Sequence, residues 1–587
     1  MRSTTSYLAL ALVSVWLTGC SHRHTDTPLA YVPDDTPYVL TNLKPLDDDT
    51  REALLARADA ALPGQLEQLR AVLPGLDSAS PQQARLLDLL SRQMQGKSVE
   101  RFSREIGVDL QGKIVLYGLG LSPVLRLPLR DPRTFSQFMA QLQNAYGQPI
   151  PGSSLDGQAY HLIDLGHSGT QLLVALRHDQ AILAILPQTA GAKLLEQALG
   201  LRTPSHSLWD SHALSDLAKA KGYHTQILAR LDTHRLLGLI AGGHDPLLRA
   251  LLTVQAGPES RQTGEPVARL ISIPPSCGND ARRIADRIPQ ISFGYTRLDA
   301  HHQDVRWDIG LADDITQTFT GLPADLPGLG AAAKAPFDLQ AAVPVAEVRN
   351  FLQTQVDAVT ANPFTCPTVA DLNTLAKRLA ILIQQLGVPP IGQLRGLRLV
   401  LDRFDSRQPG LAGLSGRAII GSQIPDSLIS TAQLFIPSTS SLRIQTNSHP
   451  VSLPDDLLAP TGQPGWIAAN SKAVAIGIGA GENTQLPADL IAPTSKEPIL
   501  GSIHLSGAMY RNWVQLAELR AAQSREAMPD ASAGDHGGSS MSISALAASS
   551  QAQIASMRAQ ADRIDHFDAR WWMEPAGLVI SNQVTLH

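Results

Sequence analysis

Long apolar runs, clusters of positive charge and aromatic residues are scarce in this chain of 587 residues. Beyond the N-terminal segment, no apolar run is long and charge-free enough to span a bilayer, so we expect a soluble body. The formal net charge is −5, and lysine and arginine are scattered without a basic stripe, which argues against a nucleic-acid partner. Aromatic residues make up only 5%, whereas Ala, Leu, Gly and Pro dominate. This composition suits helices packed on sheets with many turns, and the length allows three or four domains of about 150 residues.

The N-terminal segment has the build of a secretory signal peptide. Arg2 stands in a polar start, and an apolar run follows over residues 8–17. This run is too short to cross a bilayer as a folded helix. The segment closes on Leu17-Thr18-Gly19-Cys20, which resembles the lipobox of bacterial lipoproteins. The alternative is an ordinary signal peptide with a chance cysteine at its end, but cysteine occurs only three times in the chain.

The resemblance to bacterial lipoproteins implies a mature protein that begins at Cys20 after removal of residues 1–19. In that family the cysteine thiol is diacylated and the new amine is acylated, with chains such as palmitate. Three chains exceed the two signals that stable anchoring needs, so we expect a permanent anchor. Ser21 follows the cysteine, where Asp would favour retention in the inner membrane of Gram-negative bacteria. We therefore expect the protein on the periplasmic face of the outer membrane.

Cys277 and Cys366 are the only cysteines after the expected anchor. Both lie in proline-rich segments, and the periplasm is oxidising, so we predict that they form a disulfide. The alternative is two free, buried thiols. Two cysteines alone do not make a metal site, and the sequence places no histidine or carboxylate beside them.

The hydropathy pattern predicts an α+β fold of two similar lobes, each a mostly antiparallel sheet packed by helices. Asp131 followed by Pro132 predicts the start of a helix, and three short apolar runs over 160–186 predict a strand meander. The expected boundaries are a lipidated tether over 20–30, lobe 1 over 31–312, a Gly- and Pro-rich linker over 313–335 and lobe 2 over 336–587. A Ser-, Gly- and Ala-rich stretch over about 527–550 is expected to be a disordered insertion.

Four pairs of segments recur in the same order with nearly constant separation, which indicates an internal duplication. The paired segments are residues 106–117 with 386–401, 181–186 with 473–478, 226–232 with 500–506, and 291–311 with 564–586. The alternative is chance, because strand and helix patterns recur in any mixed protein.

Three glycine-containing segments approach known catalytic or binding motifs without completing them. Residues 166–170 (Gly-His-Ser-Gly-Thr) resemble a nucleophile elbow around Ser168, but a strand follows instead of a helix, which predicts a hairpin turn. Residues 477–481 (Gly-Ile-Gly-Ala-Gly) resemble a dinucleotide loop, but Glu482 stands at the sixth position and we expect no helix after it. Gly118 and Gly120 precede another strand, so we predict a turn there as well.

Neighbouring histidines, tryptophans and aspartates are candidates for binding residues. His22 and His24 on the tether lack fixed geometry, and neighbouring strand residues such as His301 and His302 point to opposite faces. Trp571 and Trp572 also face opposite ways, so one is expected in the core and the other could mark a binding surface. The acidic pairs at 47–49 and 455–456 are expected to cap helices. No cofactor, no metal site and no catalytic residue is predicted.

The whole chain resembles uncharacterised lipoproteins of the Gram-negative envelope through its lipobox, the opening at 33–38 (Pro-Asp-Asp-Thr-Pro-Tyr) and its alternation of apolar strands with Ala/Leu helices. That resemblance implies no activity. We therefore expect a non-enzymatic binding or assembly module for an envelope protein, glycan or lipid. The alternatives are a periplasmic hydrolase, with Ser168 as the first residue to test, and a carrier of an apolar ligand.

Overall fold

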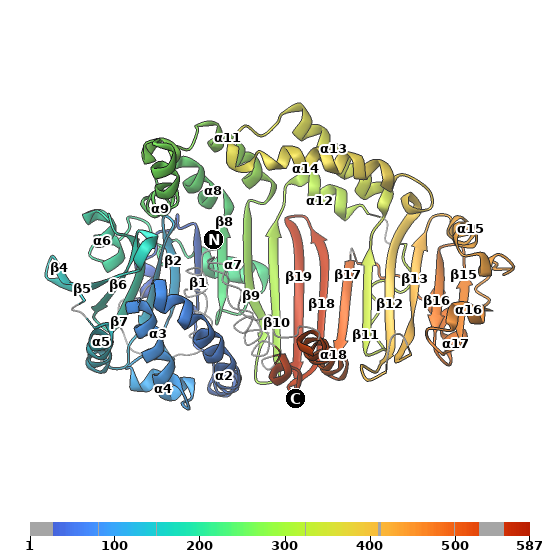
Figure 1. Cartoon of the computed structure of the whole chain (residues 1–587), viewed down its shortest axis with the longest axis horizontal. Helices are drawn as coiled ribbons and strands as arrows, with labels where there is room; N and C mark the ends of the chain where they lie inside the picture. Colours follow the sequence, from blue (N-terminus) through green and yellow to red (C-terminus); the bar gives the residue numbers. More distant parts are fainter. Residues whose placement is uncertain are drawn as a thin grey trace. The chain divides into compact units, whose positions relative to one another are not determined.

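The computed structural model describes residues 27–79, 81–147, 150–322, 325–408, 412–497, 499–526, 554 and 557–587. The predicted signal peptide 1–19, the predicted lipidation site Cys20, both tether histidines and the predicted insertion 527–550 lie outside these residues. The described chain forms two units: unit 1 holds residues 27–306 and the described residues of 532–559, and unit 2 holds residues 307–526 and 560–587. Figure 1 shows the chain coloured from its N-terminus to its C-terminus. No described helix is both long and apolar enough to span a bilayer.

Unit 1 is built on an antiparallel sheet, as expected for an α+β fold. Its strands lie in the order β4-β5-β6-β7-β3-β2-β1-β8-β9. The strands are β1 (Tyr38–Thr41), β2 (Val115–Leu119), β3 (Ser122–Pro128), β4 (Gly152–Leu155), β5 (Gln158–Asp164), β6 (Thr170–Arg177), β7 (Gln180–Pro187), β8 (Leu228–Asp232), β9 (Gln290–Leu298) and β10 (His302–Gly310), the last of which crosses the unit boundary. Strands β5, β6 and β7 form the predicted meander.

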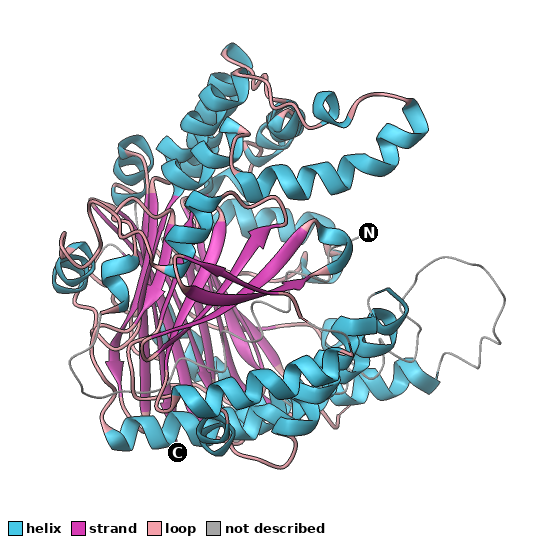
Figure 2. Cartoon of the chain, turned by 90° about the vertical axis from the view of Figure 1, so that its left-hand side faces the viewer, coloured by secondary structure: helices cyan, strands magenta, loops and turns pink. Residues whose placement is uncertain are grey.

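Helices cover both faces of this sheet because alternate strand residues point to opposite sides (Figure 2). Leu127 and Val174 pack with helices α2 to α5, whereas Val124 and Leu173 pack with α6, α7 and the N-terminal turn η1. The predicted cap is present, since the Asp131 carboxylate accepts a hydrogen bond from the Arg133 amide at 2.9 Å. The helices are η1 (Pro28–Tyr31), α2 (Asp48–Ala79), α3 (Pro81–Met94), α4 (Val99–Glu105), α5 (Pro132–Tyr146), η2 (Gly166–Ser168), α6 (Ala192–Leu199), α7 (Ala213–Lys221), α8 (Thr233–Gly242), α9 (Pro246–Thr263), α10 (Val267–Leu270) and α11 (Ser276–Arg287).

Unit 2 is also an antiparallel sheet, with the order β14-β15-β16-β13-β12-β11-β17-β18-β19. Its strands are β11 (Phe337–Ala342), β12 (Leu394–Phe404), β13 (Leu414–Ser422), β14 (Val451–Ser452), β15 (Gly465–Ala469), β16 (Ala473–Ile478), β17 (Ile499–Ser506), β18 (Ile564–Glu574) and β19 (Gly577–Leu586). Its helices are α12 (Asp313–Thr320), α13 (Val345–Ala361), η3 (Pro367–Val369), α14 (Asp371–Leu386), η4 (Ile391–Gln393), α15 (Pro425–Phe435), η5 (Pro437–Thr439), α16 (Asp455–Leu458), α17 (Glu482–Leu490) and α18 (Gly507–Glu526).

The strands of the two units repeat one order, with β1, β2, β3, β7 and β8 of unit 1 at the places of β11, β12, β13, β16 and β17. Hydrogen bonds fix the correspondence, because the Asp232 amide donates to Pro37 O and the Ser506 amide donates to Pro336 O, both at 2.8 Å. Asp232 and Ser506 also each cap the helix that follows. Duplication as the origin of this repeat stays a prediction.

The register of the repeat differs in part from the sequence match. Segments 226–232 and 500–506 coincide as predicted. Segments 106–117 and 181–186 are each displaced by one residue from their matches in unit 2, so that Tyr117 stands at the place of Val400 instead of Leu401. A displacement of one residue moves every side chain of a strand to the opposite face of the sheet. The hydrogen-bonded pairing between strands sets this register, and the sequence match does not reveal it.

Two segments that we predicted to be connections, the linker 313–335 and the end of the tether 20–30, contain helices and buried residues. The predicted linker 313–335 contains α12, and its Leu326 and Leu329 are buried in the core of unit 2. The last residues of the predicted tether form η1, where Leu29 is buried in unit 1. Gly and Pro indicate turns correctly, but they do not reveal that the leucines between them are buried.

Candidate functional site

A row of polar side chains crosses the sheet of unit 2. Residues that face each other in neighbouring antiparallel strands point to the same side of the sheet. The pairings bring Asp338 of β11 opposite His504 of β17, and His504 opposite Asp568 of β18. On the other side of Asp338, the row continues through Val400 of β12 to Arg417 of β13. The row therefore holds charged side chains from the buried interior of unit 2 to the partly exposed His504.

Arg398 is the centre of the buried part of this network. Its side chain is 7% exposed and binds the Asp338 carboxylate in bidentate fashion, with Nε–Oδ1 at 3.1 Å and Nη2–Oδ2 at 2.7 Å. Its Nη1 donates to Asp489 Oδ1 at 3.3 Å. Gln340 Nε2 also donates to Asp338 Oδ1, at 3.2 Å. A bidentate pair of this kind fixes both side chains and satisfies both charges.

Arg417 joins the same network from β13. Its Nε donates to the second oxygen of Asp489, and its Nη1 lies 2.5 Å from Asp402 Oδ2 and 3.5 Å from Glu482 Oε1. Together with Arg398, two guanidinium groups therefore meet four carboxylates. The cluster holds an excess of acid groups within a folded core.

Glu482 is the acid that this excess affects most. It is the first residue of α17 and is 2% exposed, and its Oε2 has no hydrogen-bond partner among the described residues. Burial raises the pKa of Glu482 to about 7, and the charges of Asp402 and Asp489 add to the effect of burial while Arg417 opposes it. This carboxyl group therefore exchanges a proton near neutral pH.

The other end of the row carries two histidines. His504 Nδ1 lies 2.9 Å from Asp568 Oδ1, and this hydrogen bond raises the pKa of His504. His566 Nε2 lies 3.6 Å from Asp568 Oδ2 and 3.1 Å from the hydroxyl of Thr585, while its Nδ1 lies 2.8 Å from Asp565 Oδ2. A register shift between Ile564 and His566 lets these sequence neighbours meet. The Thr585 hydroxyl, the His566 imidazole and the Asp565 carboxylate therefore form a continuous hydrogen-bonded chain.

Unit 1 has no such network at the same positions. Val39, Val115 and Val124 occupy the places of Asp338, Arg398 and Arg417, as the two ladders show. All three valines are buried among apolar side chains. The strand order is therefore compatible with apolar residues at these positions, although unit 1 buries Arg126 at another position of β3.

Ser168, the residue predicted for a hydrolase, lies in the turn η2 between two strands. Its hydroxyl is hydrogen-bonded to the carbonyl of Leu165 at 3.2 Å and to the hydroxyl of Thr170 at 2.6 Å. No imidazole or carboxylate among the described side chains is hydrogen-bonded to it. The hairpin-turn prediction is confirmed, and Ser168 has no base to activate it.

The segment 477–481 differs from prediction, because the nine-residue helix α17 follows it. The glycines allow close packing, since a Cβ on Gly477 would lie 2.9 Å from the Cβ of Glu482 and one on Gly479 would clash with Ser415. Glu482 places an acidic side chain in the first turn of α17, which disfavours a phosphate at this helix start.

The predicted turn between β2 and β3 is present and contains Gly120, whereas Gly118 belongs to β2 and pairs with Pro123. The Asp245 carboxylate lies against this turn and accepts a hydrogen bond from the Leu121 amide at 2.9 Å. Gly120 has φ +59°, and a Cβ there would lie 2.4 Å from the same oxygen.

We expect Gly120→Ala to lower the free energy of unfolding by about 1–3 kcal/mol, because it strains both the backbone and the Asp245 contact. Chemical denaturation would measure the change. Gly157→Ala is the matched control, since Gly157 also has positive φ but no atom within 4 Å of its added Cβ. An equal loss in both variants would contradict a role for the Asp245 contact.

The remaining residues singled out from the sequence have local partners. His302 Nδ1 lies 2.9 Å from Asp299 Oδ1; burial alone would raise the pKa of Asp299, but hydrogen bonds from His302 and neighbouring amides lower it. Trp571 lies over Gly501, and Trp572 Nε1 donates to Glu574 at 3.2 Å. No group of three or more His, Cys, Asp or Glu side chains within the described ranges is suited to hold a metal ion.

Cys277 and Cys366 are both buried, at 2% and 5% exposed. Each is disulfide-bonded in the structure. Cys277 lies within α11, and Cys366 immediately precedes η3. Their pairing with each other stays a prediction, which peptide mapping without reduction would test.

Comparison with known proteins gives no relative for this chain: no protein-family model, curated protein or solved structure matches it.

Proposed function

We propose that this chain is a lipid-anchored protein on the periplasmic face of the outer membrane, and that it binds a protein partner without catalysing a reaction. The observation that carries this proposal is an exposed apolar surface on α14 and the segment after it. We call it the α14 surface, and it consists of Leu375, Ile381, Leu382, Val388 and Ile391, which are 45% to 65% exposed. The five residues fall within a stretch of 17 residues, and exposed apolar residues that lie close together on a surface are typical of interaction sites.

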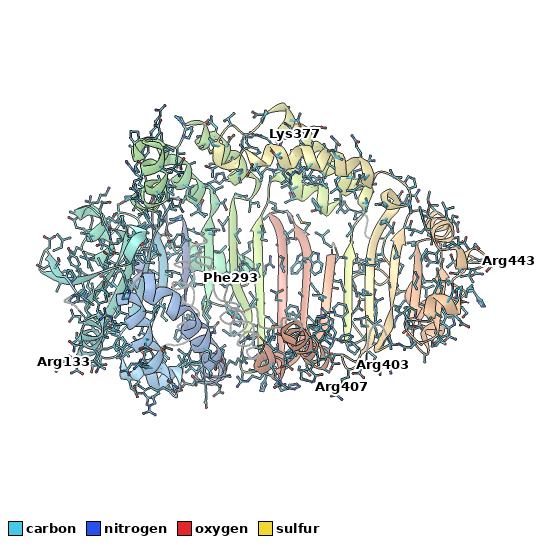
Figure 3. All side chains as sticks on the ribbon, in the orientation of Figure 1. Arg133, Phe293, Lys377, Arg403, Arg407 and Arg443 are labelled. Atoms are coloured by element: carbon cyan, nitrogen blue, oxygen red, sulfur yellow. The ribbon has the colours of Figure 1, made fainter. Side chains whose placement is uncertain are left out.

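The α14 surface is not needed to hold its own helices together. Helices α13 and α14 pair through a small separate core that contains Val356, Ala376 and Ile383 (Figure 3 labels Lys377 on α14). The helices at the same place in unit 1, α2 and α3, instead bury their leucines against the sheet. An apolar face left outside the core costs solubility, so we attribute it to a partner that covers it.

Leu382→Asp is expected to reduce recovery of the partner at least tenfold, because it buries a charge in the proposed contact. The measurement is quantitative recovery of crosslinked partner from envelopes that carry each variant. Leu434→Asp is the matched control, since Leu434 is 76% exposed on α15 and lies outside the α14 surface. Both variants should change the free energy of unfolding by no more than about 0.5 kcal/mol, as surface substitutions do. Equal recovery from both variants would contradict the proposal.

A hydrolase remains the second candidate because of Thr585, His566 and Asp565. Their distances match a nucleophile, a base and an orienting acid. This arrangement lies on β18 and β19 and excludes Ser168. Hydrolysis of an envelope substrate that disappears in His566→Ala but persists in Ser168→Ala would favour this candidate. Co-purification of a stoichiometric lipid would instead favour a carrier.

A further inference from the structure

The first described residues are firmly attached to unit 1. Leu29, Tyr31 and Val32 are buried in its core. The Leu208 amide donates to Val32 O at 2.9 Å, and Pro33 forms a β-bridge with Ser207. The first described residues therefore lie beside the loop that contains residues 206–209.

An exposed tryptophan lies in that loop. Trp209 directly follows Leu208 and is 46% exposed. The ammonium group of Lys113 lies 5.4 Å from the centre of its ring. A tryptophan with a neighbouring lysine suits the headgroup level of a bilayer, because the ring is apolar with a polar N–H and the cation can meet phosphate.

The length of the chain before the fold restricts how far this loop can lie from a membrane. Eight Cα–Cα steps separate Cys20 from Pro28, where η1 begins. Fully extended, they span at most about 29 Å. With the lipid in the bilayer, the start of η1 therefore lies within about 29 Å of Cys20, a distance at which the adjacent loop with Trp209 can reach the headgroups.

We infer that Trp209 and Lys113 form a membrane-contact site of unit 1, with the bilayer interface as its ligand. This inference rests on the proposed lipidation of Cys20. The two features are independent, since the tether length comes from the lipobox position and the exposed aromatic comes from the fold. Their coincidence at one place on unit 1 favours the bilayer over a protein as the occupant.

The test uses the full lipidated chain in vesicles of phosphatidylethanolamine and phosphatidylglycerol that contain lipids brominated in their acyl chains. Bromine quenches tryptophan fluorescence only at short range. We expect quenching in the wild-type protein, its near-complete loss in Trp209→Phe, and its retention in Trp307→Phe. Trp307 is the control because it is the other tryptophan that is at least 36% exposed within the described chain.

A photoactivatable phospholipid in the same vesicles gives a second measurement that needs no variant. We expect its adducts on the peptide that holds residues 202–212. Quenching that is equal in both variants, together with no adduct on that peptide, would overturn the membrane contact while leaving the anchor intact. Mass spectrometry of the N-terminal peptide distinguishes the other failure, because an unacylated Cys20 would overturn the anchor and the contact together.

Discussion

Asp338→Val and Arg398→Val should each lower the free energy of unfolding by about 3–5 kcal/mol, because each leaves a buried charge without its bidentate partner. The double variant Asp338→Val/Arg398→Val should recover most of this loss. The two side chains are 1% and 7% exposed, so water cannot replace the missing partner. Val39 and Val115 occupy the same two positions in the sheet of unit 1, which shows that this strand order accepts valine there.

Chemical denaturation of the two single variants and the double variant would measure this coupling as a double-mutant cycle. Arg403→Val is a matched control on the same strand, because Arg403 is exposed and its Nη2 only reaches Gln463 at 3.3 Å. A double variant whose loss equals the sum of the single losses would contradict the buried pair. Such a result would mean that Asp338 and Arg398 do not interact energetically, and that each is stabilised by its other neighbours.

Glu482→Gln should remove a pH dependence from the stability of unit 2. The pKa of Glu482 is raised from 4.5 to about 7 by burial, so the folded state binds more protons than the unfolded state between these values. The free energy of unfolding therefore falls as the pH rises from about 4.5 to 7 and stays lower above it. The loss is on the order of 3 kcal/mol in the wild-type protein, at about 1.4 kcal/mol per pKa unit.

Unfolding free energies measured from pH 4.5 to pH 8 would test this difference. At pH 8 the Glu482→Gln variant should be more stable than the wild type by about 1–3 kcal/mol, because glutamine carries no buried charge. Glu497→Gln, at an exposed position of the same unit, is the control and should leave the pH profile unchanged. A Glu482→Gln profile that still falls by the wild-type amount over this range would show that other groups cause the dependence.

The sequence predicts much of the fold because hydrophobic alternation and local caps act over short distances. The helix that begins at Pro132 and the meander of β5 to β7 follow from a few neighbouring residues each. Helix α17 was missed because Gly481 and Pro487 argue against a helix locally. Burial of Leu486 and Leu490 in the core of unit 2 outweighs that preference, and this tertiary effect is invisible in the local sequence.

The charge network of unit 2 was not predicted, for a related reason. Arg398 stands between Leu397 and Leu399, a pattern that normally places the charge in solvent and the leucines in the core. In the structure Leu397 is 41% exposed and Arg398 is buried, so the two faces of β12 are reversed from this expectation. The partners Asp338 and Asp489 are far away in sequence, and only the strand order brings them to Arg398.

Unit 2 thus combines a buried acid-rich network with an apolar surface outside its core, whereas unit 1 fixes the start of the described chain. The proposed division of labour follows from these differences. In this proposal, unit 1 would hold the protein at the membrane through Cys20 and Trp209, and unit 2 would present the α14 surface to a partner. Each half of this account can be tested without the other.

Site-specific photocrosslinking at Leu382 in intact envelopes tests the central claim most directly. A photoreactive amino acid at Leu382 should give one reproducible protein adduct. The same group at Leu434, which is 76% exposed on α15 and lies outside the α14 surface, should not give it. The account predicts an adduct at Leu382 alone, with one partner identified by mass spectrometry. Absence of any protein adduct at Leu382, or an equal adduct at both positions, would contradict a specific partner on the α14 surface.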